Sequence, residues 1–354
     1  METKIKVGAE RDIKWNPALR LERQKNYDIT RYESVPYTFE AGDFNVYKNF
    51  NFSIFIDDYC NADCKFCVAQ LRYANKGLMY KKAKIPENEW YKRCEEILKF
   101  IRPLNPSISI TGGEPTMSKK LIPVLEMVKD LGFRKRTITT NGSHLFDKVS
   151  GKMIIDHLID NGWDHLNISR PSITNEEAKS IMRFNNEEGF CSNEMMKDII
   201  KITNESPMKH RISCLLLQES VNSVPKMKEF LDTYMELGAN NFIFRELMDY
   251  DKDAINLEKT DYCVKNKVRL NDIWAQIDNY PEFEKYLNIL GYYYYVEIYK
   301  YKGATVASES ANMIQQGKEF ANHPDRVYEM VFHPNGNLCA SWVDSEKILD
   351  KYVV

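Results

Sequence analysis

The sequence predicts an α/β fold, an open partial (β/α)6 barrel that occupies the middle of the chain. Short apolar runs alternate with amphipathic helical stretches from about residue 50 to about residue 250. Glycines follow several of the helical stretches, where helices commonly end. Strands that alternate with helices form a parallel sheet with right-handed crossovers. Six such units are fewer than the eight of a closed barrel, so we expect the barrel to be open.

Each element is predicted from its own pattern. The predicted strands are Phe52–Asp58, Ser107–Thr111, Lys135–Thr140, His165–Ser169, Arg211–Leu217 and Asn241–Leu247. The predicted helices are Glu87–Ile101, Lys119–Leu131, Lys152–Asn161, Glu176–Phe184, Met195–Thr203 and Val224–Leu237. In the second helix, Ile122, Leu125 and Val128 recur on one helical face, and Gly132 stands where that helix should stop.

The two ends of the chain lack this alternation. Residues 1–48 are predicted to be an N-terminal extension, residues 49–250 the barrel, and residues 251–354 a mixed α/β C-terminal cap. Within the cap, the runs Val327–His333 and Leu338–Val343 flank the turn residues 334–337 (Pro-Asn-Gly-Asn). A turn of this composition between two apolar runs predicts a β-hairpin.

Composition narrows the class of protein. The 354 residues are 43% hydrophobic and 28% charged, as in ordinary globular proteins, and the net charge is −2. No basic excess favours duplex nucleic acid or an anionic membrane. Neither a secretory apolar stretch nor a run of about 18 apolar residues is present, so we expect a cytoplasmic protein.

Three of the eight cysteines lie close together, directly after the first predicted strand. Cys60, Cys64 and Cys67 have the spacing C-x3-C-x2-C, which allows one short loop to ligate three irons of a cubane and leaves the fourth iron open. An open metal position indicates chemistry rather than structure. A structural zinc ion would need a fourth ligand at close spacing, and the motif supplies none. The other cysteines are interpreted as buried or free thiols: Cys94, Cys191, Cys214, Cys263 and Cys339.

This loop, with Phe66 before the third cysteine, resembles the motif of the radical S-adenosylmethionine (SAM) superfamily. The resemblance implies a 4Fe–4S cluster whose open iron binds the amino and carboxylate groups of SAM. It also implies that one electron, from a donor such as flavodoxin or ferredoxin, breaks SAM into methionine and a 5′-deoxyadenosyl radical. That radical removes a hydrogen atom from the substrate.

A second motif follows the second predicted strand, where residues 111–115 (Thr-Gly-Gly-Glu-Pro) resemble the "GGE" element of the same superfamily. Two glycines let the backbone approach a ligand closely, and the Glu114 carboxylate can accept hydrogen bonds from an ammonium group. Ligands of such folds bind at the C-terminal edges of the strands, which is where this motif lies.

The ends of the later strands resemble most the branch of the GTP 3′,8-cyclases, the MoaA-like branch, over roughly residues 50 to 250. The SAM-binding residues implied by the resemblance are Phe66, Gly112, Gly113, Glu114, Thr140, Asn141, Ser169 and Met248. Arg211 falls where the cyclases have a substrate-binding lysine. Arg170 is placed to bind a carboxylate or phosphate of the substrate, or the SAM carboxylate, or to pair with an acid of the barrel.

The chain departs from the cyclases at their substrate. Ser53 and Ser109 stand where the cyclases have arginines, and the second cysteine cluster is missing. A triphosphate needs several cations, so we expect a single-cluster relative with a different substrate that carries a monoanionic group. The hairpin before Cys339 resembles the start of a SPASM cap without its cysteines, and leaves a substrate-facing role for this thiol open. The run Tyr292–Tyr295 fits either an aromatic pocket or a strand that is half core and half surface.

The leading hypothesis is therefore a radical SAM enzyme that acts on a small metabolite, a nucleoside or a peptide. A non-catalytic iron–sulfur protein for electron transfer or regulation is the alternative, and the SAM-contact residues argue against it. A zinc-stabilised binding module is the third class considered.

Overall fold

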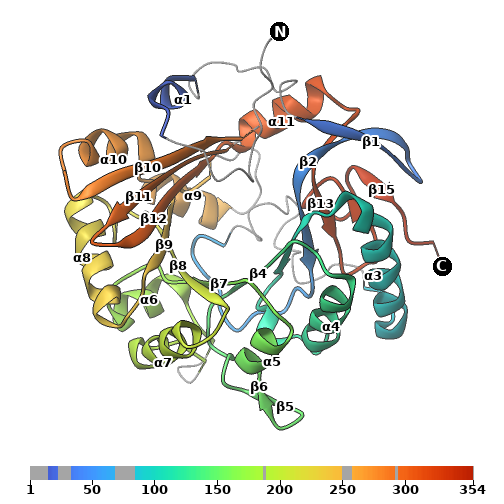
Figure 1. The fold of residues 1–354 in the computed structure, drawn as a ribbon, viewed down its shortest axis with the longest axis horizontal. Coiled ribbons are helices and arrows are strands. Elements are labelled where there is room, and N and C mark those ends of the chain that lie inside the picture. The colour runs from blue at the N-terminus through green and yellow to red at the C-terminus, as the bar shows by residue number, and fades with distance from the viewer. Residues whose placement is uncertain are drawn as a thin grey trace.

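The computed structural model describes residues 15–22, 33–67, 84–185, 189–248, 257–291 and 294–353. Six neighbouring parallel strands form its centre, in chain order around the sheet. They are β2 (Gly42–Phe55), β3 (Ser107–Thr111), β4 (Lys135–Thr140), β7 (His165–Ser169), β8 (Lys209–Leu215) and β9 (Asn241–Arg245). The helices that connect them are α3 (Glu87–Ile101), α4 (Leu121–Leu131), α5 (Ile154–Asp160), α6 (Asn175–Met182), α7 (Asn193–Asn204) and α8 (Val224–Glu236). Figure 1 shows the helices outside the curved sheet, which confirms the partial (β/α)6 barrel.

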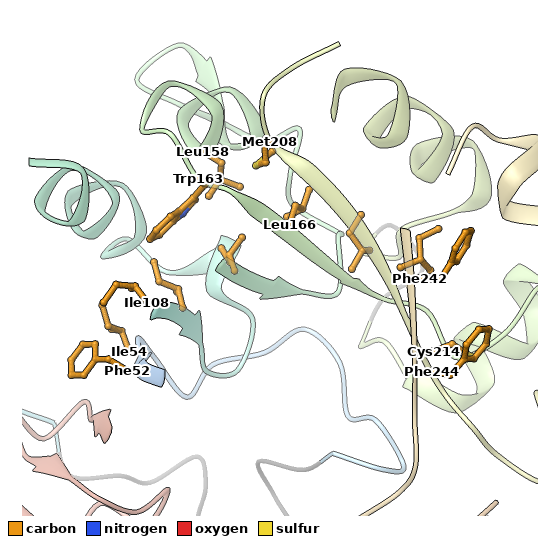
Figure 2. Close-up of a cluster of buried hydrophobic side chains, with 14 of the residues drawn as sticks. Phe52, Ile54, Ile108, Leu158, Trp163, Leu166, Met208, Cys214, Phe242 and Phe244 are labelled. Atoms are coloured by element: carbon orange, nitrogen blue, oxygen red, sulfur yellow. The ribbon is translucent and has the colours of Figure 1, made fainter. Parts of the chain in front are cut away.

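Side-chain alternation divides the strand residues between two environments. Most even-numbered residues in the central parts of the six strands, among them Phe52, Ile108, Leu166 and Phe244, are fully buried and belong to the core between sheet and helices (Figure 2). Odd-numbered residues face the inside of the barrel, because successive side chains of a strand point to opposite faces. Most of the hydrophobic core therefore lies outside the barrel wall, and the inner face carries many polar side chains together with a few apolar ones such as Phe55 and Leu215.

The predicted helix ends also have a local cause. Gly132 ends α4 in the left-handed conformation (φ +66°), and its N–H donates to the carbonyls of Val128 and Lys129. A residue without a Cβ adopts this conformation at little cost.

The region after residue 250 is mixed α/β, and two of its strands extend the parallel sheet. β12 (Ala304–Ala311) pairs in parallel with β9, and β13 (Arg326–Phe332) pairs in parallel with β2. The remaining elements of this region are α9 (Leu257–Asn266), α10 (Leu270–Ile277), β10 (Phe283–Leu290), β11 (Tyr294–Tyr301), α11 (Met313–Asn322), β14 (Leu338–Cys339) and β15 (Ile348–Asp350). β12 and β13 cover the hydrogen-bonding edges that an open six-stranded sheet would expose.

The proposed domain limits stay predictions. At the N-terminal side, α1 (Pro17–Glu22) precedes β1 (Ser34–Phe39), which pairs antiparallel with β2. β2 itself runs across the limit proposed between residues 48 and 49. Two short strands, β5 (Lys148–Val149) and β6 (Lys152–Met153), form a separate hairpin before α5.

The predicted C-terminal hairpin is present between β13 and β14. The N–H of His333 donates to the carbonyl of Asn337 (3.0 Å), and Gly336 has φ +81°. β14 ends at Cys339, earlier than the predicted run, and Cys339 is completely buried. Tyr295 is also buried, against Trp274, whereas Tyr292 and Tyr293 lie outside the described residues. No helix among the described residues has the length and hydrophobicity needed to cross a bilayer.

Candidate active site

A cavity of about 410 Å³ opens at the C-terminal edges of the barrel strands. Cys60, Cys64 and Cys67 line it together, and each is partly buried. The other five cysteines of the chain are buried. The structure thus brings the predicted iron ligands to the place where the fold predicts a ligand site.

The surroundings of the cysteine thiols favour binding to a metal cluster over ionisation in water. Burial raises the pKa of Cys60 to about 12, and burial together with the nearby Cys67 and Cys60 raises the pKa of Cys64 well above its usual range. A thiol in this setting keeps its proton unless a metal cation replaces it. Among the described residues, no three Cys, His, Asp or Glu side chains converge as ligands of one ion. Thiolates that bind three different irons of a cubane do not need to converge in this way.

The cysteine loop is held against the Gly-Gly-Glu segment by backbone hydrogen bonds. The N–H of Gly113 donates to the carbonyl of Asp57 (2.8 Å), and the N–H of Glu114 donates to that of Tyr59 (2.7 Å). A Cβ at Gly112 would lie 2.4 Å from the Asp57 oxygen. The sequence-based reason for the glycines, close approach to a ligand, is therefore incomplete, because the cysteine loop itself is what their Cα atoms approach.

Glu114 is almost fully buried and ties this segment to the end of β4. Its Oε1 accepts hydrogen bonds from the Thr116 N–H (3.0 Å), the Thr116 hydroxyl (2.6 Å) and the Thr140 hydroxyl (2.5 Å), and its Oε2 accepts one from the Asn141 N–H (2.7 Å). A carboxylate has about four acceptor positions, two on each oxygen. Oε1 accepts three of these bonds and Oε2 accepts one, so Oε2 is the oxygen with fewer donors from the protein.

Asn61, which sequence reasoning missed, links the cysteine loop to Asn141. The Asn141 amide donates to Asn61 Oδ1 (2.8 Å), and the Asn61 amide donates to Ser143 Oγ (3.0 Å) and to the carbonyl of Gly189 (2.9 Å). Asn141 is therefore engaged in positioning the loop as well as lining the cavity. The only signal for Asn61 was its place between two cysteines.

Charged side chains fix the other end of the cysteine loop. Lys259 Nζ donates to the carbonyl of Cys64 (2.5 Å) and pairs with Asp63 (2.7 Å), which also pairs with Arg183 (2.7 Å). These contacts join the loop to α9 and to the residue that follows α6. Phe66 packs on Met182 and Leu247 in a small hydrophobic cluster, and Ser169 and Met248 line the cavity as expected.

Arg170 lines the cavity but is 2% exposed. Its guanidinium donates to the Tyr234 hydroxyl (2.6 Å), the Cys191 carbonyl (2.9 Å), Asn175 Oδ1 (2.7 Å) and Asn193 Oδ1 (2.6 Å). Four of its five N–H groups are used, and none of these partners is a carboxylate. The pairing with a barrel acid that the sequence allowed is thus not observed among the described residues, and one N–H makes no hydrogen bond to them.

Arg211 is not among the residues that line the cavity. Ser213, two residues further along β8, does line it, so Arg211 points to the same interior face one step deeper in the barrel. Its Nε donates to Asn167 Oδ1 (2.8 Å). Burial lowers the pKa of Arg211 to about 10, with a further contribution from the charge of Arg245. This position does not support the prediction that Arg211 contacts the substrate directly.

Sequence reasoning missed three charged residues of the cavity wall, Arg245 at the end of β9, Glu246 directly after it and Glu309 in β12. Arg245 had a signal, because it is an inward-facing residue near the C-terminal end of the predicted strand Asn241–Leu247. Glu309 had none, because β12 was not predicted to join the barrel. The remaining wall on the strand side carries hydroxyl groups from Ser53, Ser109, Thr111, Thr139, Ser169 and Ser213.

Comparison with known proteins agrees with this site. The family model described as "Radical SAM superfamily" matches residues 54–231, half of the chain. A 7,8-dihydro-6-hydroxymethylpterin dimethyltransferase of Methanocaldococcus jannaschii is 35% identical over 94 residues, which cover 26% of this chain and 17% of that protein. A probable GTP 3′,8-cyclase of Methanococcus maripaludis is 26% identical over 181 residues, 51% of this chain and 54% of that protein.

Among solved structures, Streptococcus suis SuiB bound to S-adenosylmethionine aligns with a TM-score of 0.48 at 17% identity, over 82% of this chain and 58% of that one. The chain thus covers less than two thirds of each of these relatives: 17% of the dimethyltransferase, 54% of the cyclase and 58% of SuiB.

Proposed function

Because the chain belongs to the radical SAM superfamily, an enzyme family that uses a 4Fe–4S cluster and SAM, we propose that it cleaves SAM reductively and abstracts a hydrogen atom from a small substrate. Cys60, Cys64 and Cys67 hold the single cluster. When bound, the cluster and SAM supply a 5′-deoxyadenosyl radical at the substrate. The observation that carries the proposal is that one cavity is lined by all three cysteines, by the predicted SAM contacts and by a polar wall.

The protein's own residues divide this cavity into two parts. On the side of the cysteine loop, Glu114 Oε2, which accepts one hydrogen bond from the protein, accepts another from the ammonium of SAM, and the remaining N–H of Arg170 donates to its carboxylate. Ser169 and Met248 contact the rest of the cofactor. On the opposite side, Ser109, Ser213 and Arg245 face the space that is left for substrate.

The substrate differs from that of the cyclases. Ser53 and Ser109, where the cyclases have arginines, both line the cavity, so their hydroxyl groups replace two cations at the surface that would receive a triphosphate. A small metabolite, a nucleoside or one residue of a peptide fits this surface better. An external one-electron donor such as flavodoxin or ferredoxin supplies the electron.

The test is incubation of anaerobically reconstituted protein with SAM and dithionite, with methionine and 5′-deoxyadenosine measured by chromatography. We expect both products in equal amounts, formed slowly without substrate, and neither product from Cys60→Ala, Cys64→Ala or Cys67→Ala. Cys339→Ala, a cysteine outside the cavity, is the matched control. A protein that holds the cluster and cycles its redox state without forming 5′-deoxyadenosine would instead be an electron-transfer or regulatory protein.

A further inference from the structure

Arg245 and Glu309 are cross-strand neighbours in the parallel register of β9 and β12, and both line the cavity. Arg245 Nε lies 3.3 Å from Glu309 Oε1, and 34% and 29% of the two side chains are exposed. Arg245 Nε is buried without a hydrogen-bond partner. No described residue accepts a hydrogen bond from this guanidinium, and none donates one to the Glu309 carboxylate. The guanidinium and the carboxylate form an ion pair, but neither makes a hydrogen bond to a described residue.

The other charged groups of the cavity wall have hydrogen-bond partners in the protein, and the capacity that remains on Arg170 and Glu114 is the part assigned above to SAM. Arg170 donates four hydrogen bonds and Glu114 accepts four, as described above. Glu246 pairs with Lys267 (3.3 Å) and accepts from the N–H of Leu270 (3.2 Å). Buried polar groups in native proteins nearly always have partners. The pair of Arg245 and Glu309 is therefore where a bound ligand has polar contacts left to make.

The charges around Arg245 and Glu309 indicate which charged groups a bound ligand carries. Arg211 lies deeper in the barrel on the neighbouring strand β8, where the charges of Arg245 and Glu309 both act on it, so two guanidinium groups lie in the field of the Glu309 carboxylate. An incoming carboxylate balances the second cation, and a forked guanidinium suits it geometrically. Glu309, in turn, is an acceptor without a donor, and an ammonium group supplies one.

We propose that Arg245 and Glu309 form a subsite for the α-carboxylate and α-ammonium groups of a free amino acid, which is the substrate of the proposed radical reaction. These two groups are attached to one carbon, so they reach two adjacent side chains of opposite charge at once. A residue inside a peptide has neither charge. The role of the amino acid as a substrate rests on the proposed function. The binding of the amino acid is tested independently of that function.

The test measures binding to cluster-loaded protein with SAM and without reductant, by isothermal titration. The probes are the twenty common L-amino acids, each added singly, followed by the N-acetyl derivative and the amide of the amino acid that binds most tightly. We expect saturable binding of at least one amino acid, and binding weaker by about tenfold or more for both derivatives, because each lacks one charge.

Two substitutions test whether Arg245 and Glu309 are the residues that bind the amino acid. Arg245→Met and Glu309→Gln should each weaken binding of the amino acid by about tenfold or more. Arg269→Met and Glu284→Gln, at exposed positions, are matched controls that should bind as the unaltered protein does. Iron content and the melting temperature verify folding, and Arg245→Lys, which keeps the charge but loses the fork, replaces Arg245→Met if that variant does not fold.

Three results would overturn the subsite. They are the absence of saturable binding by any of the twenty amino acids, equal binding of the N-acetyl derivative, and unchanged binding by both variants. Equal binding of the N-acetyl derivative would leave a carboxylate site without a role for Glu309. Failure to form 5′-deoxyadenosine while an amino acid still binds would refute the proposed function and leave the subsite in place.

Discussion

A Cβ atom at Gly113 would lie 1.9 Å from the carbonyl oxygen of Tyr59, the residue before the first cysteine of the cluster loop. The Tyr59 oxygen accepts the N–H of Glu114 in the same contact. A backbone oxygen cannot rotate away as a side chain can. Gly113 therefore sets the distance between the two loops that meet at the cluster.

Gly113→Ala should consequently lower the occupancy of the cluster and not only the affinity for SAM. The added methyl group pushes the backbone at Tyr59 outward and moves Cys60 from its place, so we expect the reconstituted variant to hold fewer than about two irons per chain. Gly317→Ala is the control, because its Cβ meets open space in α11. Full iron content in Gly113→Ala, with SAM affinity alone reduced, would return the glycine to a purely ligand-contacting role.

The number of irons tests the single-cluster assignment. Reconstituted protein should hold about four irons per chain, and Cys64→Ala should lose nearly all of them, since one missing thiolate leaves the cubane incompletely held. Cys339→Ala should keep them, because this buried thiol lies outside the cavity. About eight irons per chain, retained when all three loop cysteines are changed, would contradict the assignment.

Arg170 should prove important for stability. Arg170→Ala removes four hydrogen bonds and leaves their buried acceptors unpaired, so the free energy of unfolding of cluster-free protein should fall by about 3 kcal/mol or more. Arg170→Lys should recover little, since an ammonium cannot reach acceptors on several sides. Urea denaturation measures both, with exposed Arg269→Ala expected to stay within about 0.5 kcal/mol.

GTP should not be a substrate. With hydroxyl groups at Ser53 and Ser109, the cavity lacks the cations that a triphosphate requires, so equilibrium dialysis should find no binding tighter than about 1 mM. GTP should also leave the rate of 5′-deoxyadenosine formation unchanged. Stimulation by GTP would restore the cyclase reaction.

His210 should contribute to the acid sensitivity of the fold. Burial lowers its pKa from 6.5 to about 4, and its Nε2 accepts the N–H of Asn240 (3.3 Å), which requires the neutral ring. The unfolded chain binds a proton at this histidine below pH 6.5 and the folded chain does not until about pH 4. The stabilisation is therefore present above pH 6.5 and is lost as the pH falls toward 4, by up to about 3 kcal/mol.

His210→Gln should flatten the dependence of unfolding free energy on pH in that window, as measured by urea denaturation at a series of pH values. Equal slopes in the unaltered protein and His210→Gln would show that another group causes the acid sensitivity.

Local sequence patterns were enough to predict the repeating units and the cluster loop. The strands Ser107–Thr111, Lys135–Thr140 and His165–Ser169 have the predicted bounds, because alternation of buried and turn residues is written into each short segment. The three cysteines were equally readable, since one contiguous loop carries all of them.

Contacts between residues that are distant in the sequence could be seen only in the tertiary structure. The approach of Gly113 to Tyr59 and the pairing of Arg245 with Glu309 join segments from different strands, and their register follows from the curvature of the whole sheet. The same register places Ser213 on the cavity and Arg211 beneath it. A sequence pattern specifies which face of a strand a residue occupies, because that alternation is local. The depth of the residue in the barrel is set by the packing of all the strands together.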